Sequence, residues 1–148
     1  MTATTERRRT AGVRMKRIGW TLAVLAACAA TALPARAQST PTPEDQAQQV
    51  ARGKAVFESQ CSICHSAEEG RNKTGPSLFS VVGRRAGRVE GFAYSDANRN
   101  SGVVWTVETL DLYLTRPKGV VPHNAMTYGG IQDAGKRADL IAYLATLR

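Results

Sequence analysis

The sequence predicts an all-α protein with extended loops, and three observations lead to this class. Apolar residues recur at helical spacing in three segments, at about residues 44–61, 106–115 and 133–147. Glycines and prolines, among them Gly75-Pro76 and Gly129-Gly130, mark long turns between these segments. Between the segments, no run alternates apolar and polar side chains as a half-buried strand would. We therefore expect three to five short helices joined by long loops.

Residues 1–37 have the pattern of a signal peptide. A basic stretch to Arg17 precedes an uncharged, sixteen-residue run over residues 18–33, and the small residues within 34–37 fit the cleavage rule. The run is shorter than the stretch of about twenty residues that spans a bilayer. Met1 and Met15 are alternative translation starts. We expect export to the periplasm, with the mature chain starting at Gln38.

Cys28 offers an alternative fate for this segment. Leu25-Ala26-Ala27-Cys28 resembles the box at which bacterial lipoproteins are cleaved and lipidated. Hydrophobic residues continue past Cys28 to Leu33, which favours cleavage after Ala37 instead. Membrane attachment is expected only if Cys28 is lipidated or the signal is retained.

The formal charge of +8 is concentrated in the signal. Seven of the twenty Lys and Arg residues and one of the twelve acidic residues precede Gln38, so the remainder carries about +2. No basic tract interleaved with aromatic residues follows residue 40. Nucleic-acid binding is therefore not expected.

Residues 38–45 read as a flexible leader, because Pro, Ser and Thr predominate and no packing pattern is present. Glu44 and Asp45 then favour the start of a helix. Gly53, one turn before Phe57, would let another helix approach closely. The residues that recur at helical spacing along this segment are Val50, Lys54, Phe57 and Cys61.

The segment Cys61-Ser62-Ile63-Cys64-His65 has the spacing of a covalent haem attachment site. Thiols three residues apart share one face of a helical turn, and the adjacent imidazole can bind the iron. A zinc site needs about four ligands, and only Cys28 and His123 remain as candidates. A redox dithiol usually follows a strand, and none is predicted here. We predict one covalent haem c, which would add apolar mass to a thin core.

Two later helices complete the pattern. The helix over residues 106–115 places Leu110, Tyr113 and Leu114 on one side, and Pro117 ends it. The helix over residues 133–147 has an apolar face and a polar face that we expect to stay in water. The apolar face consists of Leu140, Ile141, Tyr143, Leu144 and Leu147, and the polar face of Lys136, Arg137 and Asp139.

Many short motifs occur in order along the mature chain. They are Gly53–Phe57, Cys61–His65, Thr74–Leu78, Gly83-Arg84, Gly91–Asn98, Trp105, Tyr113-Leu114, Pro117-Lys118, Pro122, Met126 and Asp139–Leu144. With these motifs the chain resembles the class I cytochromes c, mitochondrial and bacterial, over nearly all of residues 53–147. The resemblance implies a small cytochrome c fold over residues 46–148, wrapped around one haem.

The resemblance also implies the axial ligands of the iron. His65 would be one ligand, and Met126, in a loop with little core to fill, would be the second. The Pro76 carbonyl would accept a hydrogen bond from the His65 ring, and Tyr113 would lie near the Met126 sulfur.

Further residues gain roles only from the resemblance. Arg84, Tyr94 and Trp105 would direct donors at the haem propionates, and Asn98 would join a buried polar network. The two terminal helices would cross, with Gly53 and Phe57 packed against Leu140 and Tyr143.

The chain departs from the family at the exposed edge of the haem. His123 stands where relatives usually have glycine, and it is either a surface residue or a competing ligand. Asn124 replaces a threonine that relatives direct at a propionate. Relatives that meet acidic oxidases place lysines where this chain has Ala125, Gln132 and Asp133, while Lys118 remains. We expect association to depend only moderately on salt.

The leading functional prediction is a non-enzymatic one-electron carrier of a respiratory chain, with redox proteins as donor and acceptor. We expect it to act as a monomer. Two alternatives remain: a haem subunit of a larger dehydrogenase or oxidase complex, and an enzyme or gas sensor with an open axial position. Met126 speaks against the open position.

Overall fold

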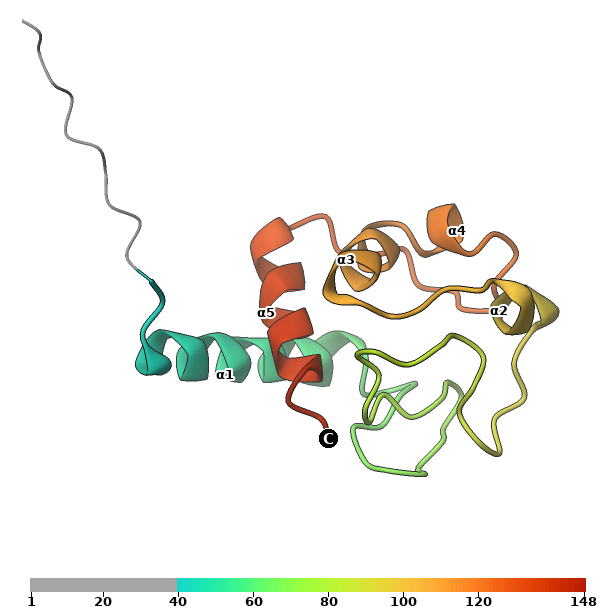
Figure 1. The fold of residues 1–148 in the computed structure, drawn as a ribbon, viewed down its shortest axis with the longest axis horizontal. Coiled ribbons are helices and arrows are strands. Elements are labelled where there is room, and N and C mark those ends of the chain that lie inside the picture. Colours follow the sequence, from blue (N-terminus) through green and yellow to red (C-terminus); the bar gives the residue numbers. More distant parts are fainter. Residues whose placement is uncertain (1–39) are drawn as a thin grey trace, which may run out of the picture. The chain divides into compact units, whose positions relative to one another are not determined.

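The structure, a computed structural model, describes residues 40–148, and helices joined by long loops build this part of the chain (Figure 1). Its helices are α1 (Pro43–Gln60), α2 (Asp96–Asn100), α3 (Val107–Thr115), α4 (Pro117–Val120) and α5 (Ala134–Leu144). The described residues contain no strand, only an isolated antiparallel bridge between Arg85 and Val104. The all-α prediction is therefore confirmed. The predicted signal peptide and Cys28 lie outside the described residues.

The helix α1 begins earlier than the sequence suggests. Thr42 is its N-cap: the Thr42 hydroxyl accepts from the Asp45 backbone N–H at 3.1 Å, and the Asp45 carboxylate accepts from the Thr42 backbone N–H at 2.9 Å. Pro43 occupies the first turn, where its missing N–H costs nothing. Residues 43–45, predicted as leader, thus form the first turn of α1.

The two terminal helices cross at Gly53, as predicted. A Cβ atom at Gly53 would lie 1.9 Å from the Asp139 carbonyl oxygen, so only glycine permits this approach. The Phe57 and Tyr143 rings lie 5.5 Å apart, and Leu140 is fully buried beside them. On the outside of the crossing, Arg52 of α1 donates to the Asp139 carboxylate at 2.9 and 3.1 Å.

The later helices differ from the prediction in three ways. The helix α3 ends at Thr115, before Pro117, as predicted, but Pro117 also begins α4, which was not predicted, since proline is favoured in a first helical turn. The helix α5 ends at Leu144, three residues before the predicted end. The prediction that Arg137 stays in water is wrong: Arg137 is buried, with its guanidinium bonded to Asp111, whereas Lys136 is exposed.

No helix within residues 40–148 is long and apolar enough to cross a membrane. The core instead joins α1, α3 and α5 to the loops, through Phe57, Val81, Trp105, Leu110, Leu114, Val121, Ile131, Leu140, Ile141 and Leu144. Several of these side chains also line one cavity, which α3 and the loops surround.

Candidate haem site

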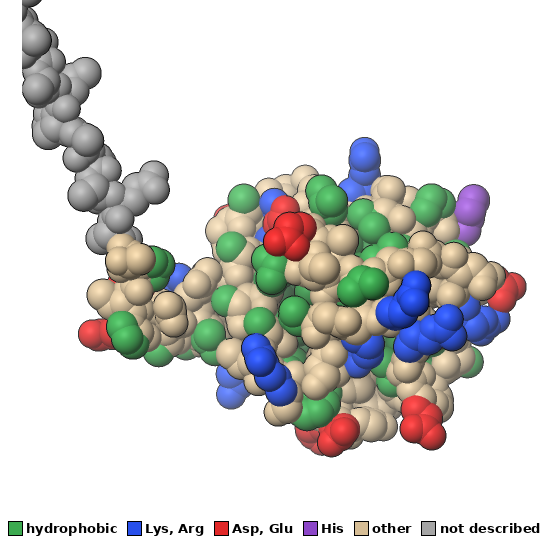
Figure 2. Space-filling view, in the orientation of Figure 1, with side chains coloured by type: hydrophobic (Ala, Val, Ile, Leu, Met, Phe, Trp, Pro, Cys, Tyr) green, Lys and Arg blue, Asp and Glu red, His purple; other side chains and the backbone are tan. Residues whose placement is uncertain are grey.

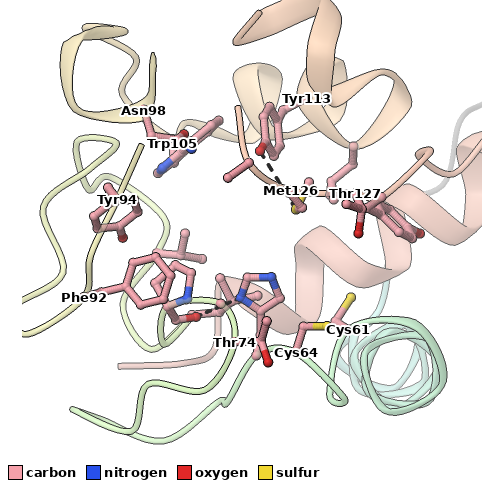
Figure 3. A pocket seen from close by; sticks show the side chains of 18 of the residues that line it. Cys61, Cys64, Thr74, Phe92, Tyr94, Asn98, Trp105, Tyr113, Met126 and Thr127 are labelled. Atoms are coloured by element: carbon pink, nitrogen blue, oxygen red, sulfur yellow. Dashed lines mark hydrogen bonds between the residues drawn. The ribbon is translucent and has the colours of Figure 1, made fainter. Parts of the chain in front are cut away.

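A cavity of about 460 Å³ lies between α3, the end of α1 and the loops (Figure 3). This volume falls in the range of small-molecule and cofactor sites, about 300–1,000 Å³. Every residue predicted for the site lines it: Cys61, Cys64, His65, Pro76, Arg84, Tyr94, Asn98, Trp105, Tyr113 and Met126. The structure thus brings together residues that the sequence separates by 65 positions.

The two cysteines lie on the tight turn that follows α1. Backbone bonds from Cys64 N–H and His65 N–H to the Cys61 carbonyl, 3.0 and 2.9 Å long, hold this turn. Both thiols are free and half-buried, and they lie close together at one edge of the cavity (Figure 3). Burial raises the pKa of Cys61 to about 11, so its thiol is protonated at neutral pH.

His65 is held at two places. Its Nδ1 atom lies 2.8 Å from the Pro76 carbonyl oxygen, the contact that the family resemblance implies. Its ring lies against Gly75, where a Cβ atom would approach Cε1 to 2.4 Å. Burial lowers the pKa of His65, which favours the neutral imidazole. With Nδ1–H donating to Pro76, the lone pair of Nε2 is free to bind a metal.

Met126 faces the cavity from the side opposite to the cysteines (Figure 3). Its sulfur lies 3.9 Å from the Tyr113 hydroxyl, which donates toward it. The Tyr113 ring packs on Trp105, with centroids 4.7 Å apart. Burial raises the pKa of Tyr113 to about 12, so this donor keeps its proton at neutral pH.

One part of the cavity wall is polar and consists of Arg84, Tyr94, Trp105 and Asn98. Arg84 and Asn98 make contacts that the resemblance did not imply. The Arg84 guanidinium donates to the carbonyls of Phe79 and Ser77, at 2.7 and 2.9 Å. Burial lowers its pKa. The buried network predicted for Asn98 is absent from the described residues: Asn98 is half-buried, and its side chain bonds only to the Ser95 hydroxyl, at 3.5 Å.

The sequence interpretation missed several lining residues. Leu78, Phe92, Leu110 and Thr127 line the cavity as well. Phe92 packs edge-on against Tyr94, with ring centroids 4.7 Å apart. Leu78 and Phe92 belong to the motifs Thr74–Leu78 and Gly91–Asn98, but these stretches have no periodicity that would show which side chains point into a cavity.

His123 and Asn124 occupy the segment before Met126. His123 is exposed, does not line the cavity, and has a φ of 60°, a conformation that favours glycine. Asn124 is buried, and it donates to the Val121 carbonyl at 2.7 Å and accepts from the Met126 backbone N–H at 3.0 Å. Asn124 therefore shapes the loop on which Met126 lies.

The residues present fit a covalent haem. A neutral imidazole and a thioether face one mainly apolar cavity, and two thiols lie at its edge. Hydroxyl, indole and guanidinium donors line another part of the wall, where carboxylates would find partners. Among the described residues, no cluster of three or more His, Cys, Asp or Glu offers a conventional metal site. An imidazole, a thioether and two thiols suit an iron that a porphyrin holds.

Comparison with known proteins gives concordant matches. The "Cytochrome c" family model matches residues 50–148. A cytochrome c of Euglena viridis is 47% identical over 97 residues, covering 66% of this chain and 95% of that protein. A cytochrome c2 of Rhodopila globiformis is 50% identical over 96 residues, covering 65% and 91%. Among solved structures, cytochrome cH from Methylobacterium extorquens superimposes with a TM-score of 0.61 at 41% identity, covering 66% of this chain and 97% of that one. The matched segment contains every residue that lines the cavity.

Proposed function

This chain belongs to the cytochrome c family, and on that premise we propose that His65 and Met126 would both bind the iron of its haem. The protein is an electron carrier with a c-type haem, for which Cys61 and Cys64 have the attachment spacing. The bound haem supplies a one-electron Fe(II)/Fe(III) couple. One observation carries the proposal: both ligand side chains line the same cavity, and a further group holds each of them.

The two supporting contacts have different effects. The Pro76 carbonyl fixes the tautomer and orientation of His65, which would leave Nε2 free to bind the iron. The Tyr113 hydroxyl points at the Met126 sulfur, and it withdraws electron density from the thioether. Because these contacts hold both side chains, a haem bound between them would rearrange little when its charge changes.

The polar wall would hold the haem propionates. Tyr94 and Trp105 each carry one donor, and Arg84 adds a positive charge that is half-buried. The Arg84 guanidinium has five N–H donors, and two carbonyls occupy only part of this capacity. Asn98, which also lines the cavity, would be a fourth side chain with a donor. The mainly apolar remainder of the lining would keep water from the iron.

A closed iron suits a carrier better than an enzyme or a sensor, each of which needs a free position. The test is the far-red absorption of the oxidised protein, where methionine-ligated ferric haem shows a weak sulfur-to-iron band. The chain has three methionines, and Met1 and Met15 precede the predicted mature start. We expect the band in the wild type and in the control Thr127→Ala, and its loss in Met126→Ala. A native protein without the band at neutral pH would indicate an open position or His123 ligation.

We propose that the protein acts as a monomer and that its partners are redox proteins, which bind at the mouth of the cavity. Ile63 lies there between the two cysteines, 85% exposed, and Ala125 and Thr127 are exposed lining residues too. None of the three is charged. Charges of both signs lie on the face shown in Figure 2, with several Lys and Arg side chains gathered toward α2. Electron-transfer rates with a partner should therefore change only modestly with ionic strength.

We also propose that the chain is exported to the periplasm. The proposal rests on the signal pattern of residues 1–37, which precede a short leader and the helical, haem-binding part of the chain. The mass of the purified protein tests it. A chain starting at Gln38 supports cleavage after Ala37, whereas a chain starting at a lipidated Cys28 indicates membrane attachment.

A further inference from the structure

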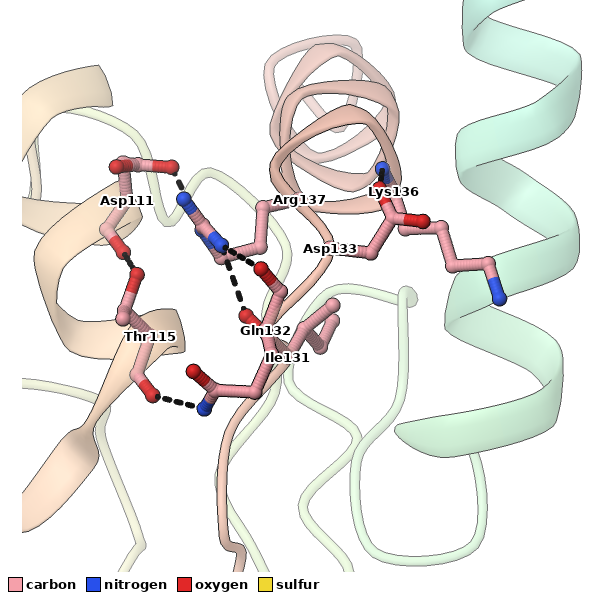
Figure 4. A network of polar contacts seen from close by, with 7 residues as sticks. All are labelled: Asp111, Thr115, Ile131, Gln132, Asp133, Lys136 and Arg137. Atoms are coloured by element: carbon pink, nitrogen blue, oxygen red, sulfur yellow. Dashed lines mark hydrogen bonds and ion pairs between the residues drawn. The ribbon is translucent and has the colours of Figure 1, made fainter.

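The loop that carries Met126 is tied down at its far end by a buried arginine. We call residues 121–133, between α4 and α5, the ligand loop. Arg137 lies on α5 with only 10% of its side chain exposed. Its Nη1 donates to the carbonyls of Ile131 and Gln132, at 2.9 and 3.1 Å, and its Nε donates to the Asp111 carboxylate of α3 at 2.8 Å (Figure 4). One guanidinium thus joins α3, α5 and the loop.

The same end of the loop also bonds directly to α3. The Ile131 backbone N–H donates to the Leu114 carbonyl at 2.7 Å, and the Gln132 side chain donates to the Thr115 carbonyl at 3.2 Å. At Gly130, whose φ is 100°, a Cβ atom would lie 2.3 Å from the Thr115 carbonyl oxygen. The loop therefore lies directly against the end of α3, and Arg137 bonds the two carbonyls that follow this contact.

The helix α3 meets the loop a second time, at Met126 itself. Tyr113, one residue before Leu114, directs its hydroxyl at the Met126 sulfur. Between Met126 and Ile131 lie only four residues, and two of them are glycines. Asn124 accepts from the Met126 backbone N–H on one side, and the Tyr128 hydroxyl, within this short link, donates to Gln60. The two glycines add little stiffness, so the position of Met126 also depends on where the loop is fixed to α3.

We propose that Arg137 is a positioning residue for Met126, holding the far end of the ligand loop against α3 so that the sulfur stays on the iron. The inference rests on the proposed function, in which Met126 is a ligand. Hydrogen bonds from a charged donor are among the stronger ones in proteins, and a buried guanidinium that loses its acceptors is costly. Opening of the loop removes the two carbonyls from Arg137, so Arg137 disfavours opening.

The test is the displacement of Met126 by imidazole in the oxidised holoprotein, followed as loss of the far-red band. Arg137→Met keeps the apolar stem and removes the donors. Arg52→Met is the control for a lost link between helices, because the Arg52 side chain, which is 58% exposed, also makes two bonds that join two helices, without contact to the loop. We expect apparent imidazole affinity to rise roughly tenfold or more in Arg137→Met, and less than twofold in Arg52→Met. Equal changes in the two variants would overturn the proposal.

A second variant covers the case in which Arg137→Met does not fold. Arg137→Lys keeps the positive charge but cannot reach Asp111 and both carbonyls as a fork. We expect it to fold and to raise imidazole affinity by a smaller factor than Arg137→Met. Wild-type affinity in a folded Arg137→Lys would overturn the proposal.

Amide hydrogen exchange separates this inference from the proposed function. If the wild type itself lacks the band, the proposed ligation fails, but the tie between loop and α3 can still be measured. The Ile131 N–H, bonded to Leu114, should then exchange roughly tenfold faster in Arg137→Met than in Arg52→Met. Equal exchange rates would show that Arg137 does not hold the loop.

Discussion

Replacing Gly75 with alanine tests whether the His65 ring packs against residue 75. The backbone at Gly75 has no positive φ, so alanine meets no conformational penalty there. The obstacle is the imidazole: the new Cβ would lie 2.4, 2.7 and 2.8 Å from Cε1, Nδ1 and Nε2 of His65. Distances under 3.0 Å essentially do not occur for Cβ atoms, so either the ring or the backbone must move.

The size of the effect follows from these distances. To restore an ordinary contact of 3.4 Å, the ring must retreat by about 1 Å. The ring cannot rotate away freely, because its Nδ1 is bonded to the Pro76 carbonyl. Overpacking costs about 1–3 kcal/mol, and a weakened hydrogen bond adds about 0.5–1.5 kcal/mol. Alanine also lowers the conformational entropy of the unfolded chain, which stabilises the folded protein by about 0.4–1 kcal/mol. We expect a net loss of about 0.5–4 kcal/mol in the free energy of unfolding.

Urea denaturation of the holoprotein, followed by far-ultraviolet circular dichroism, measures this loss. The matched control is Gly129→Ala, because a Cβ atom at Gly129 meets nothing within 4 Å and its φ is not positive. The control should be neutral or more stable by up to about 1 kcal/mol. Equal stability of Gly75→Ala and Gly129→Ala would show that the His65 ring does not pack against Gly75.

Three further predictions concern the helix crossing, the ligand loop and the Met126 contact. Gly53→Ala places a Cβ atom 1.9 Å from the Asp139 carbonyl oxygen and should cost at least about 1 kcal/mol in urea denaturation, despite the better helix propensity of alanine; unchanged stability would contradict it. His123→Gly should raise the free energy of unfolding by about 0.5–1 kcal/mol, because His123 has a φ of 60°; a less stable variant would speak against strain there. The pKa of Tyr113 rises from 10.0 to about 12 on folding, so the unfolded chain releases this proton first and the wild type should lose stability relative to Tyr113→Phe as pH rises from about 10 to about 12. A stability difference that does not change over this range would disprove the burial of the phenol.

The sequence was a good guide wherever a residue's role follows from spacing or from direct contact. The helical period predicted α1, α3 and α5. Gly53 indicated that another helix could approach closely, because such an approach requires the absence of a Cβ atom, and the resemblance implied that α1 and α5 cross there. The motif ending in His65 supported the family resemblance, and the resemblance predicted the contact between His65 and Pro76.

The errors come from features that tertiary structure decides. The helices α2 and α4 have five and four residues, too few to show a period. Arg137 lies beside exposed Lys136 on a face that looks polar in the sequence, but residues far along the chain, Asp111 and Ile131, supply its partners. Asn98 likewise received its network from the resemblance, and its own surroundings provide only Ser95.

The His65 side of the cavity is held more rigidly than the Met126 side. His65 follows Cys64 directly, its ring packs on Gly75, and the Gly75 backbone N–H bonds back to the Cys64 carbonyl at 2.7 Å. Met126 lies on a loop with two glycines after it, and its sulfur has one 3.9 Å contact with a hydroxyl. A perturbation of the fold should therefore release Met126 before it displaces His65. With Met126 bound to the iron as proposed, contacts remote from the iron, such as those of Arg137, would decide how long Met126 stays bound.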